Sequence, residues 1–123
     1  MAAYDKTRSV LTRIHAYCSE IEVITERFGR SYETYLNDSV YRHACSMIIM
    51  QIGELASRLP EDFCMIYNEI PWKKIRGMRN LFAHDYEKTS DSITWATIET
   101  SIPEIKLFCK KTLRDMELNK DIK

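Results

Sequence analysis

The stretch DSVYRHACSMIIMQIGELASRLP, residues 38–60, places apolar side chains at helical spacing between an acidic residue and a proline. Asp38 is a suitable N-cap, because a short acidic side chain accepts hydrogen bonds from the first free backbone N–H groups of a helix. Pro60 ends the pattern, since proline cannot continue a helix. The apolar positions are Tyr41, Ala44, Ile48, Ile52, Leu55 and Leu59. The stretch therefore predicts a long helix with one buried face.

Gly53 lies inside this predicted helix, where glycine costs about 1 kcal/mol relative to alanine. A close crossing of two helices would explain it, because glycine has no side chain to hold two backbones apart. Glu54 follows in an otherwise apolar stretch, where a charge needs a partner. We consider pairing with Arg76 or Arg79, with exposure to water as the alternative.

Length and composition indicate one folded domain. The chain has 123 residues, of which 45% are hydrophobic and 29% charged. It contains only three glycines and three prolines, and so few backbone breakers favour long helices over a many-turned β fold. Capping residues and apolar spacing predict further helices: from Asp5 to Gly29, briefly after Ser31 and after Pro60, from Pro71 to Tyr86, and from Asp91 onward with a joint at Pro103.

The last predicted helix buries the residues Ile93, Ile98, Ile102, Ile105, Cys109, Thr112 and Met116. From about residue 117 we expect a loose C-terminal tail. Together these elements predict an all-α fold, an up-and-down helical bundle of four to five helices in a single domain, residues 1–123.

The charges of the chain balance, with 18 Lys and Arg against 18 Asp and Glu. A chain without excess positive charge does not coat nucleic acid non-specifically, although a local basic site remains open. The N-terminus lacks the apolar region of a signal peptide, and no apolar run is long enough to span a membrane. The four cysteines show no C-x-x-C spacing, so we expect reduced, mostly buried thiols and a cytoplasmic protein.

The stretch MRNLFAHDY, residues 78–86, combines apolar and polar residues in a pattern that suggests phosphate chemistry. On a helical wheel, one side is apolar apart from Lys74 and Asp85. The other side is a polar arc that holds Lys73, Arg76, Arg79, Asn80 and His84. Arginine matches phosphate oxygens with a planar fork of donors, and the other cations add phosphate-binding charge.

An arginine and a histidine suffice in principle to cleave RNA without a metal. His84 would move a proton at the ribose 2′-hydroxyl or at the leaving oxygen, and Arg79 would stabilise charge on the phosphate. On an ideal helix, however, these two residues diverge by about 140°. A break in the helix, a long reach by Arg79, or a second copy of the helix in a homodimer would each close this gap.

The pattern Arg79, four residues, His84, one residue, Tyr86 resembles the motif of HepT-like toxins in the HEPN superfamily. The resemblance extends to IGEL at residues 52–55 and to EIPWKKIRGMRN at residues 69–80, and it covers nearly the whole chain. It implies an all-α homodimer that cleaves RNA without metal or cofactor. It also implies a partner, an MNT-type nucleotidyltransferase antitoxin that attaches AMP to the toxin.

The resemblance also implies roles for single residues. Arg79 and His84 would be catalytic, with Asn80 in support, and Tyr86 would be the acceptor of AMP. Lys73 and Arg76, which share the polar arc, would bind RNA phosphates. Two alternatives belong to other classes: a non-catalytic module that docks a nucleotidyltransferase or its nucleotide, and a purely structural helical dimer.

Overall fold

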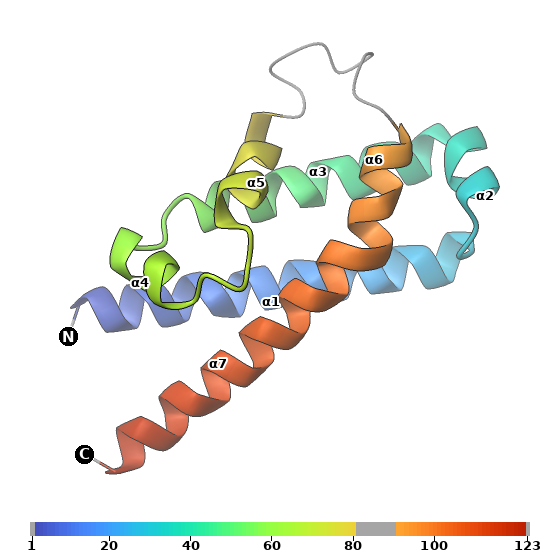
Figure 1. The fold of residues 1–123 in the computed structure, drawn as a ribbon. Coiled ribbons are helices and arrows are strands. Elements are labelled where there is room, and N and C mark those ends of the chain that lie inside the picture. Colours follow the sequence, from blue (N-terminus) through green and yellow to red (C-terminus); the bar gives the residue numbers. More distant parts are fainter. Residues whose placement is uncertain (1, 81–90, 123) are drawn as a thin grey trace.

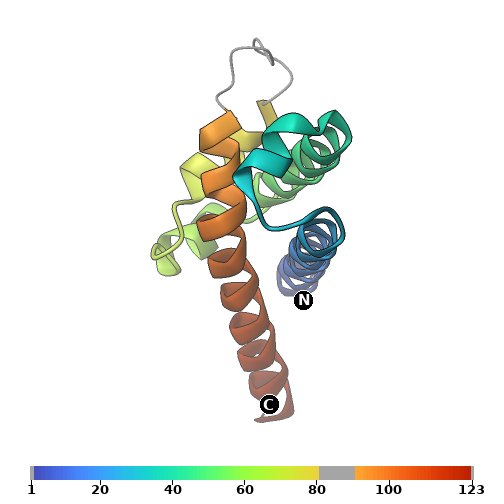
Figure 2. The ribbon, with the colours of Figure 1, turned by 90° about the vertical axis from the view of Figure 1, so that its right-hand side faces the viewer.

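The computed structural model describes residues 2–80 and 91–122, and these residues form helices and no strand. Three long helices set the frame, α1 (Ala2–Phe28), α3 (Ser39–Ala56) and α7 (Ile102–Ile122). α1 packs against both of the others (Figure 1). Figure 2 looks nearly along α1 and shows α3 and α7 on different sides of it. The predicted all-α helical bundle is therefore confirmed.

The two ends of α1 differ in how well the sequence predicts them. The helix begins at Ala2, so Asp5 lies within its first turn and the prediction of Asp5 as its cap is wrong. The two alanines ahead of Asp5 favour helix strongly and extend it, while the acidic charge still suits the N-terminal end of the helix dipole. Gly29 ends α1 as predicted, with a φ of 111° and an N–H that donates to the Thr25 carbonyl at 2.9 Å.

Two predicted N-caps are confirmed. Ser31 caps the short helix α2 (Tyr32–Asn37), and Asp38 caps α3. In both, a side-chain oxygen accepts hydrogen bonds from backbone N–H groups of the first turn. α3 ends at Ala56, a turn earlier than Pro60.

The buried face of α3 is wider than the predicted stripe. Ala44 and Ile48 are only half-buried, whereas their neighbours Cys45 and Ile49 are completely enclosed. The reason is that α3 has neighbours on two sides, since it packs against α1 and against the segment that carries the motif. A helix between two neighbours buries more than one stripe of side chains.

The segment after α3 departs most from the prediction. After α4 (Glu61–Ile66), the helix α5 spans only Trp72–Gly77, and a single 3₁₀ turn, η1 (Met78–Asn80), follows it. One continuous helix to Tyr86 was predicted, and this is wrong because the α-helix ends at Gly77; Tyr86 itself lies outside the described residues. Glycine is a weak helix former, and η1 packs directly on α3, so tertiary contact sets the local geometry.

The C-terminal third is one bent helical path. It consists of α6 (Asp91–Ala96), a π-helical turn η3 (Thr97–Ser101), and α7 (Figure 1). Asp91 is the first residue of α6 and not a cap ahead of it, a shift of one position from the prediction. The predicted joint at Pro103 is confirmed, since the π turn ends at Ser101, two residues before this proline, which lacks the N–H of a regular turn. α7 also includes residues 117–122, where we expected a loose tail.

α1 and α7 are joined by side chains. Three polar contacts tie them together: Lys106 Nζ to Glu22 Oε2 at 2.8 Å, Arg8 to Glu117 Oε2 at 2.8 Å, and the Tyr4 hydroxyl donating to the Met116 carbonyl at 2.6 Å. Buried apolar residues such as Ile14 and Ile105 fill the core beneath them. These contacts hold the frame on which the motif-bearing segment rests.

The four cysteines are distributed over four helices, and all are free and buried, as predicted. They are Cys18 in α1, Cys45 in α3, Cys64 in α4 and Cys109 in α7. Burial raises the pKa of Cys18 and of Cys45 to about 12, and it also raises the pKa of Cys64 and of Cys109. Thiols in such surroundings stay protonated and unreactive.

Candidate functional site

The segment α5–η1 divides cleanly into a buried and an exposed side. Trp72, Ile75 and Met78, spaced three apart, point into the core. The exposed polar residues between and beyond them are Lys73, Lys74, Arg79 and Asn80, and Gly77 is exposed as well. The division into an apolar side and a polar arc that the wheel predicted is therefore confirmed at the described positions, except that Lys74 also reaches solvent.

Trp72 anchors the start of this segment. Its indole Nε1 donates a hydrogen bond of 2.9 Å to the Tyr67 carbonyl, and its ring lies 5.5 Å from that of Phe108 and 6.1 Å from that of Phe63. The ring thus joins α4, α5 and α7 at one point. Aromatic pairs in such edge-on arrangements add stabilisation beyond the area that they bury.

Gly53 of α3 fixes the other end of the segment. A Cβ atom at this position would stand 2.6 Å from the Arg79 backbone nitrogen and 2.8 Å from the Ile75 carbonyl oxygen. No real side chain fits at such distances, so only glycine lets α3 and η1 meet backbone to backbone. The close helix crossing that Gly53 suggested is therefore confirmed, and it lies directly beneath Arg79.

The structure brings two residues of the motif together and describes no more of it. Arg79 and Asn80 are adjacent and exposed on η1, as a substrate-binding role requires. His84 and Tyr86 lie outside the described residues. An ideal α-helical wheel no longer applies beyond Gly77, because a 3₁₀ turn has about three residues per turn. The predicted angle of about 140° between Arg79 and His84 assumed a continuous α-helix and therefore no longer holds as an argument.

The other predicted charges have neighbours of their own. Glu54 lies 3.9 Å from Arg58, one helical turn later, and both side chains are about half exposed. Of the two alternatives considered for Glu54, pairing with Arg76 or Arg79 is replaced by this local ion pair, and the carboxylate also reaches solvent. The Arg76 Nε donates to the Trp72 carbonyl at 3.3 Å. Arg76 also borders a hollow with Glu61 and other residues of α4, while Lys73 is exposed on α5.

A groove lies between α5–η1 and α6, which stand on the same side of α3 (Figures 1 and 2). We call it the α5–α6 groove. It has a volume of about 310 Å³, and the described residues that line it are Lys74, Gly77, Met78, Asn80, Ile93, Thr94 and Thr97. The motif and the groove share Asn80.

Sequence reasoning missed most of this groove. Ile93 was expected in the core, but it is 62% exposed, because the path of α6 turns this side chain away from the bundle and into the groove. The one feature of the sequence that indicated an opening here was Lys74, because a lysine on the apolar side of a predicted helix needs access to water. Here it reaches water at the mouth of the groove.

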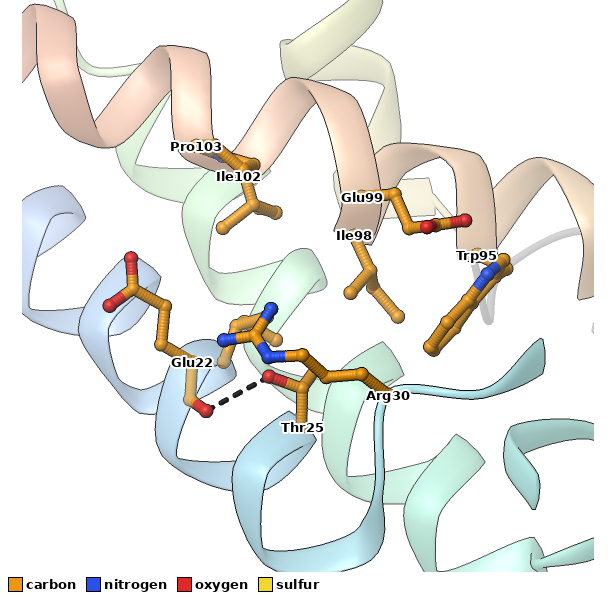
Figure 3. Close-up of a pocket in the computed structure, with 9 residues that line it drawn as sticks. Glu22, Thr25, Arg30, Trp95, Ile98, Glu99, Ile102 and Pro103 are labelled. Atoms are coloured by element: carbon orange, nitrogen blue, oxygen red, sulfur yellow. Dashed lines mark hydrogen bonds between the residues drawn. The ribbon is translucent and has the colours of Figure 1, made fainter.

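A separate cavity of about 160 Å³ lies between α1 and the α6–α7 joint (Figure 3). Arg30 extends into it from the turn after α1, and Glu22 and Glu99 stand at its edges. The Thr25 hydroxyl, which also lines it, donates to the Glu22 carbonyl at 2.9 Å. None of the described residues of the predicted site, Lys73, Arg76, Arg79 and Asn80, lines this cavity.

The chain is similar to known ribonucleases. Residues 14–112 match the family described as "Ribonuclease HepT-like". A protein of Caldanaerobacter subterraneus named "Putative RNase" is 35% identical over 96 residues, which are 77% of this chain and 86% of that protein. "Probable ribonuclease HepT" of Thermococcus cleftensis is 33% identical over 88 residues, covering 70% of this chain and 79% of its own. No solved structure matches the chain significantly.

The fold and the exposed basic turn define an all-α protein of HEPN-like architecture. The family match covers most of the chain, and it includes α3 with Gly53, the turn that carries Arg79, and the parts of α1 and α7 within residues 14–112. The chain belongs to the HepT-like ribonuclease family. No described helix is both long and apolar enough to cross a membrane.

Proposed function

We propose that this chain is a metal-independent endoribonuclease, the toxin of a HEPN/MNT toxin–antitoxin pair. The observation that carries the proposal is the placement of Arg79 and Asn80. They are exposed on a turn whose backbone is pressed against Gly53, so the arginine has a fixed base and a free approach to substrate. Family membership supports RNA as the substrate class.

The proposed chemistry is attack by the ribose 2′-oxygen on the neighbouring phosphorus. The bond to the 5′-oxygen breaks, and a cyclic phosphate remains. His84 transfers a proton at one of these two oxygens, and Arg79 stabilises charge on the phosphoryl oxygens. Asn80 supports the pair, and Lys73 and Arg76 bind flanking phosphates. The reaction requires no oxidant, reductant or cofactor.

Cleavage of labelled RNA in the presence of EDTA tests the proposal. We expect wild type to cut, and His84→Ala to lose about 10²–10⁴-fold in rate because proton transfer is lost. Arg79→Ala should lose about 10²–10³-fold. Arg114→Ala, which changes an exposed arginine on α7, is the matched control and should cut as wild type does. Equal cleavage by wild type and His84→Ala would show that the activity has another source.

The chain acts as a homodimer in this proposal, so that two motifs share one cleft. Support comes from the family resemblance alone, since the helical wheel no longer separates Arg79 from His84. Light scattering at micromolar concentration should give twice the mass of the chain. A monomer that still cleaves RNA would contradict the homodimer with a shared cleft but would agree with the proposed ribonuclease activity.

Regulation by an MNT-type antitoxin completes the proposal. Transfer of AMP to Tyr86, seven residues after Arg79 in the motif, would add negative charge to the motif and compete with the RNA phosphate. Mass spectrometry after co-expression should show added AMP in wild type and none in Tyr86→Phe. If both gain AMP equally, or neither does, the antitoxin acts at another residue or by binding alone.

A further inference from the structure

The α5–α6 groove has the chemical character of a site for a flat, partly polar ring. Ile93 and Met78 supply apolar surface, and Asn80, Thr94 and Thr97 supply hydrogen-bonding groups. At about 310 Å³ it is at the lower end of the size range of ligand pockets. It therefore suits one small ring system and not an extended ligand.

The exposure of Ile93 is the unusual feature of this groove. An isoleucine that is 62% exposed normally needs no explanation when it stands alone. Here it shares a wall with the buried Met78 and with the Thr97 hydroxyl, which donates to the Ile93 carbonyl at 3.0 Å. That hydrogen bond uses the hydroxyl proton and leaves the oxygen of Thr97 able to accept.

The charge of the groove suits a ligand attached to phosphates. Lys74 is the one charged residue among the described residues that line it, and none of these carries a carboxylate. The cavity of Figure 3 differs, since the carboxylates of Glu22 and Glu99 border it as well as Arg30. Unlike that cavity and the hollow beside Arg76, which Glu61 borders, the α5–α6 groove has no carboxylate among its described lining residues that would repel a phosphate backbone.

We propose that the α5–α6 groove receives a nucleobase that flanks the scissile phosphate, so that it sets the base preference of cleavage. The inference rests on the proposed ribonuclease function and deepens it, because Asn80 connects the groove to the motif. Ile93 and Met78 pack against the faces of the base, the Thr97 hydroxyl oxygen accepts a hydrogen bond from its edge, and Lys74 contacts the adjoining phosphate.

Substitution of Ile93 tests the groove without disturbing the core. Ile93→Ala should weaken binding of single-stranded RNA about 5- to 10-fold, because the removed aliphatic carbons no longer pack against the base. It should also flatten the base preference at one position beside the cut, as read from the sequenced ends of cleaved random oligonucleotides. Leu107→Ala is the matched control, since Leu107 is 63% exposed on α7 and lies outside the groove.

Substitution of Lys74 separates the phosphate contact from base recognition. Lys74→Gln should weaken binding equally for all sequences and lower the dependence of binding on salt by about one ion. Its control is Lys110→Gln, which removes an exposed charge from α7. A change of base preference in Lys74→Gln together with no change in Ile93→Ala would overturn the assignment.

The outcomes for groove and function are distinguishable. If wild type cleaves RNA and Ile93→Ala matches it in affinity and base preference, the groove is not a base site, while the ribonuclease stands. If wild type cleaves no RNA, fluorescence anisotropy measures the binding of a 2′-O-methyl oligonucleotide, and this binding tests the groove independently of cleavage. Weaker binding by Ile93→Ala than by Leu107→Ala then supports the groove although catalysis fails, and equal binding or no binding overturns the groove as well.

Discussion

The contact between α1 and α7 and the contact between α3 and η1 are built in different ways. The first is made by side chains, with buried residues such as Ile105 and ion pairs above them. The second is made by backbones, with no side-chain atom between Gly53 and Arg79. Side-chain contacts adjust when a residue changes, whereas backbone contacts do not. A substitution in the frame should therefore lower stability and leave activity in place, whereas a substitution beneath the motif-bearing turn should lower activity as well.

The largest effect on stability is expected in the frame. Ile105→Ala should lower the free energy of unfolding by about 2–5 kcal/mol, because it leaves a cavity between α1 and α7. Activity per folded molecule should stay close to that of wild type, since no motif residue contacts Ile105 among the contacts that the structure describes. Urea denaturation and RNase assays at a temperature where both proteins are folded measure the two quantities.

Gly53→Ala should lower the free energy of unfolding less than Ile105→Ala does, but it should lower the RNase activity more. Its methyl group would overlap the Arg79 nitrogen, and overpacking of this kind costs about 1–3 kcal/mol. The turn has to shift to make room, and displacement of a catalytic group by about 1 Å lowers activity about 10²-fold. Denaturation and RNase assays on the same preparation report both losses.

Gly77→Ala is the stability control for this substitution, and because Gly77 lines the α5–α6 groove its activity is compared at saturating RNA. A Cβ at Gly77 would meet nothing within 4 Å, and alanine favours helix by up to about 1 kcal/mol. Stability should stay equal or rise slightly. If Gly53→Ala and Gly77→Ala have the same activity, the contact beneath Arg79 does not position the arginine.

The parts of the fold that the sequence predicted are set by local interactions. Ser31 and Asp38 cap helices through their own side chains, and Gly29 and Pro103 act through their own backbones. Any segment containing these residues would behave in the same way in another fold. By contrast, the end of α5 at Gly77 depends on where α3 lies, and no local pattern carries that information.

A smaller effect is expected for the ion pair of Lys106 and Glu22, which is partly shielded from water. A double-mutant cycle with Lys106→Met and Glu22→Gln should give a coupling of about 0.5–1 kcal/mol. The coupling should shrink as salt is added, since ions screen exposed charges. A coupling that survives 1 M salt would show that the pair is more buried than its geometry indicates.

The smallest effect is expected for Arg8 and Glu117, whose side chains are more exposed than those of Lys106 and Glu22. The coupling between them should be about 0–0.5 kcal/mol, because solvent screens the attraction and both side chains lose freedom. The same cycle with Arg8→Met and Glu117→Gln measures it. A larger coupling here than for Lys106 and Glu22 would reverse the expected order along α1 and α7.

The sequence predicted which residues of the candidate site are exposed, but it did not predict the groove that they form with α6. The exposure of Arg79 and Asn80 followed from the apolar partners of the same segment, Ile75 and Met78. The groove needs α6 beside η1, which no spacing within either element predicts. Ile93 shows the limit clearly, since its spacing suits the core stripe and only the path of α6 exposes it.

The distribution of the cysteines allows local unfolding of the protein to be followed by labelling of its own thiols. Because α1, α3, α4 and α7 each hold one enclosed thiol, a thiol reagent reaches a cysteine only after the packing around that thiol opens. The order in which Cys18, Cys45, Cys64 and Cys109 become labelled would therefore give the order in which the surroundings of these four thiols open. The native cysteines serve as the probes, and labelling of Cys64 reports when the packing around α4, the helix next to the motif-bearing segment, opens.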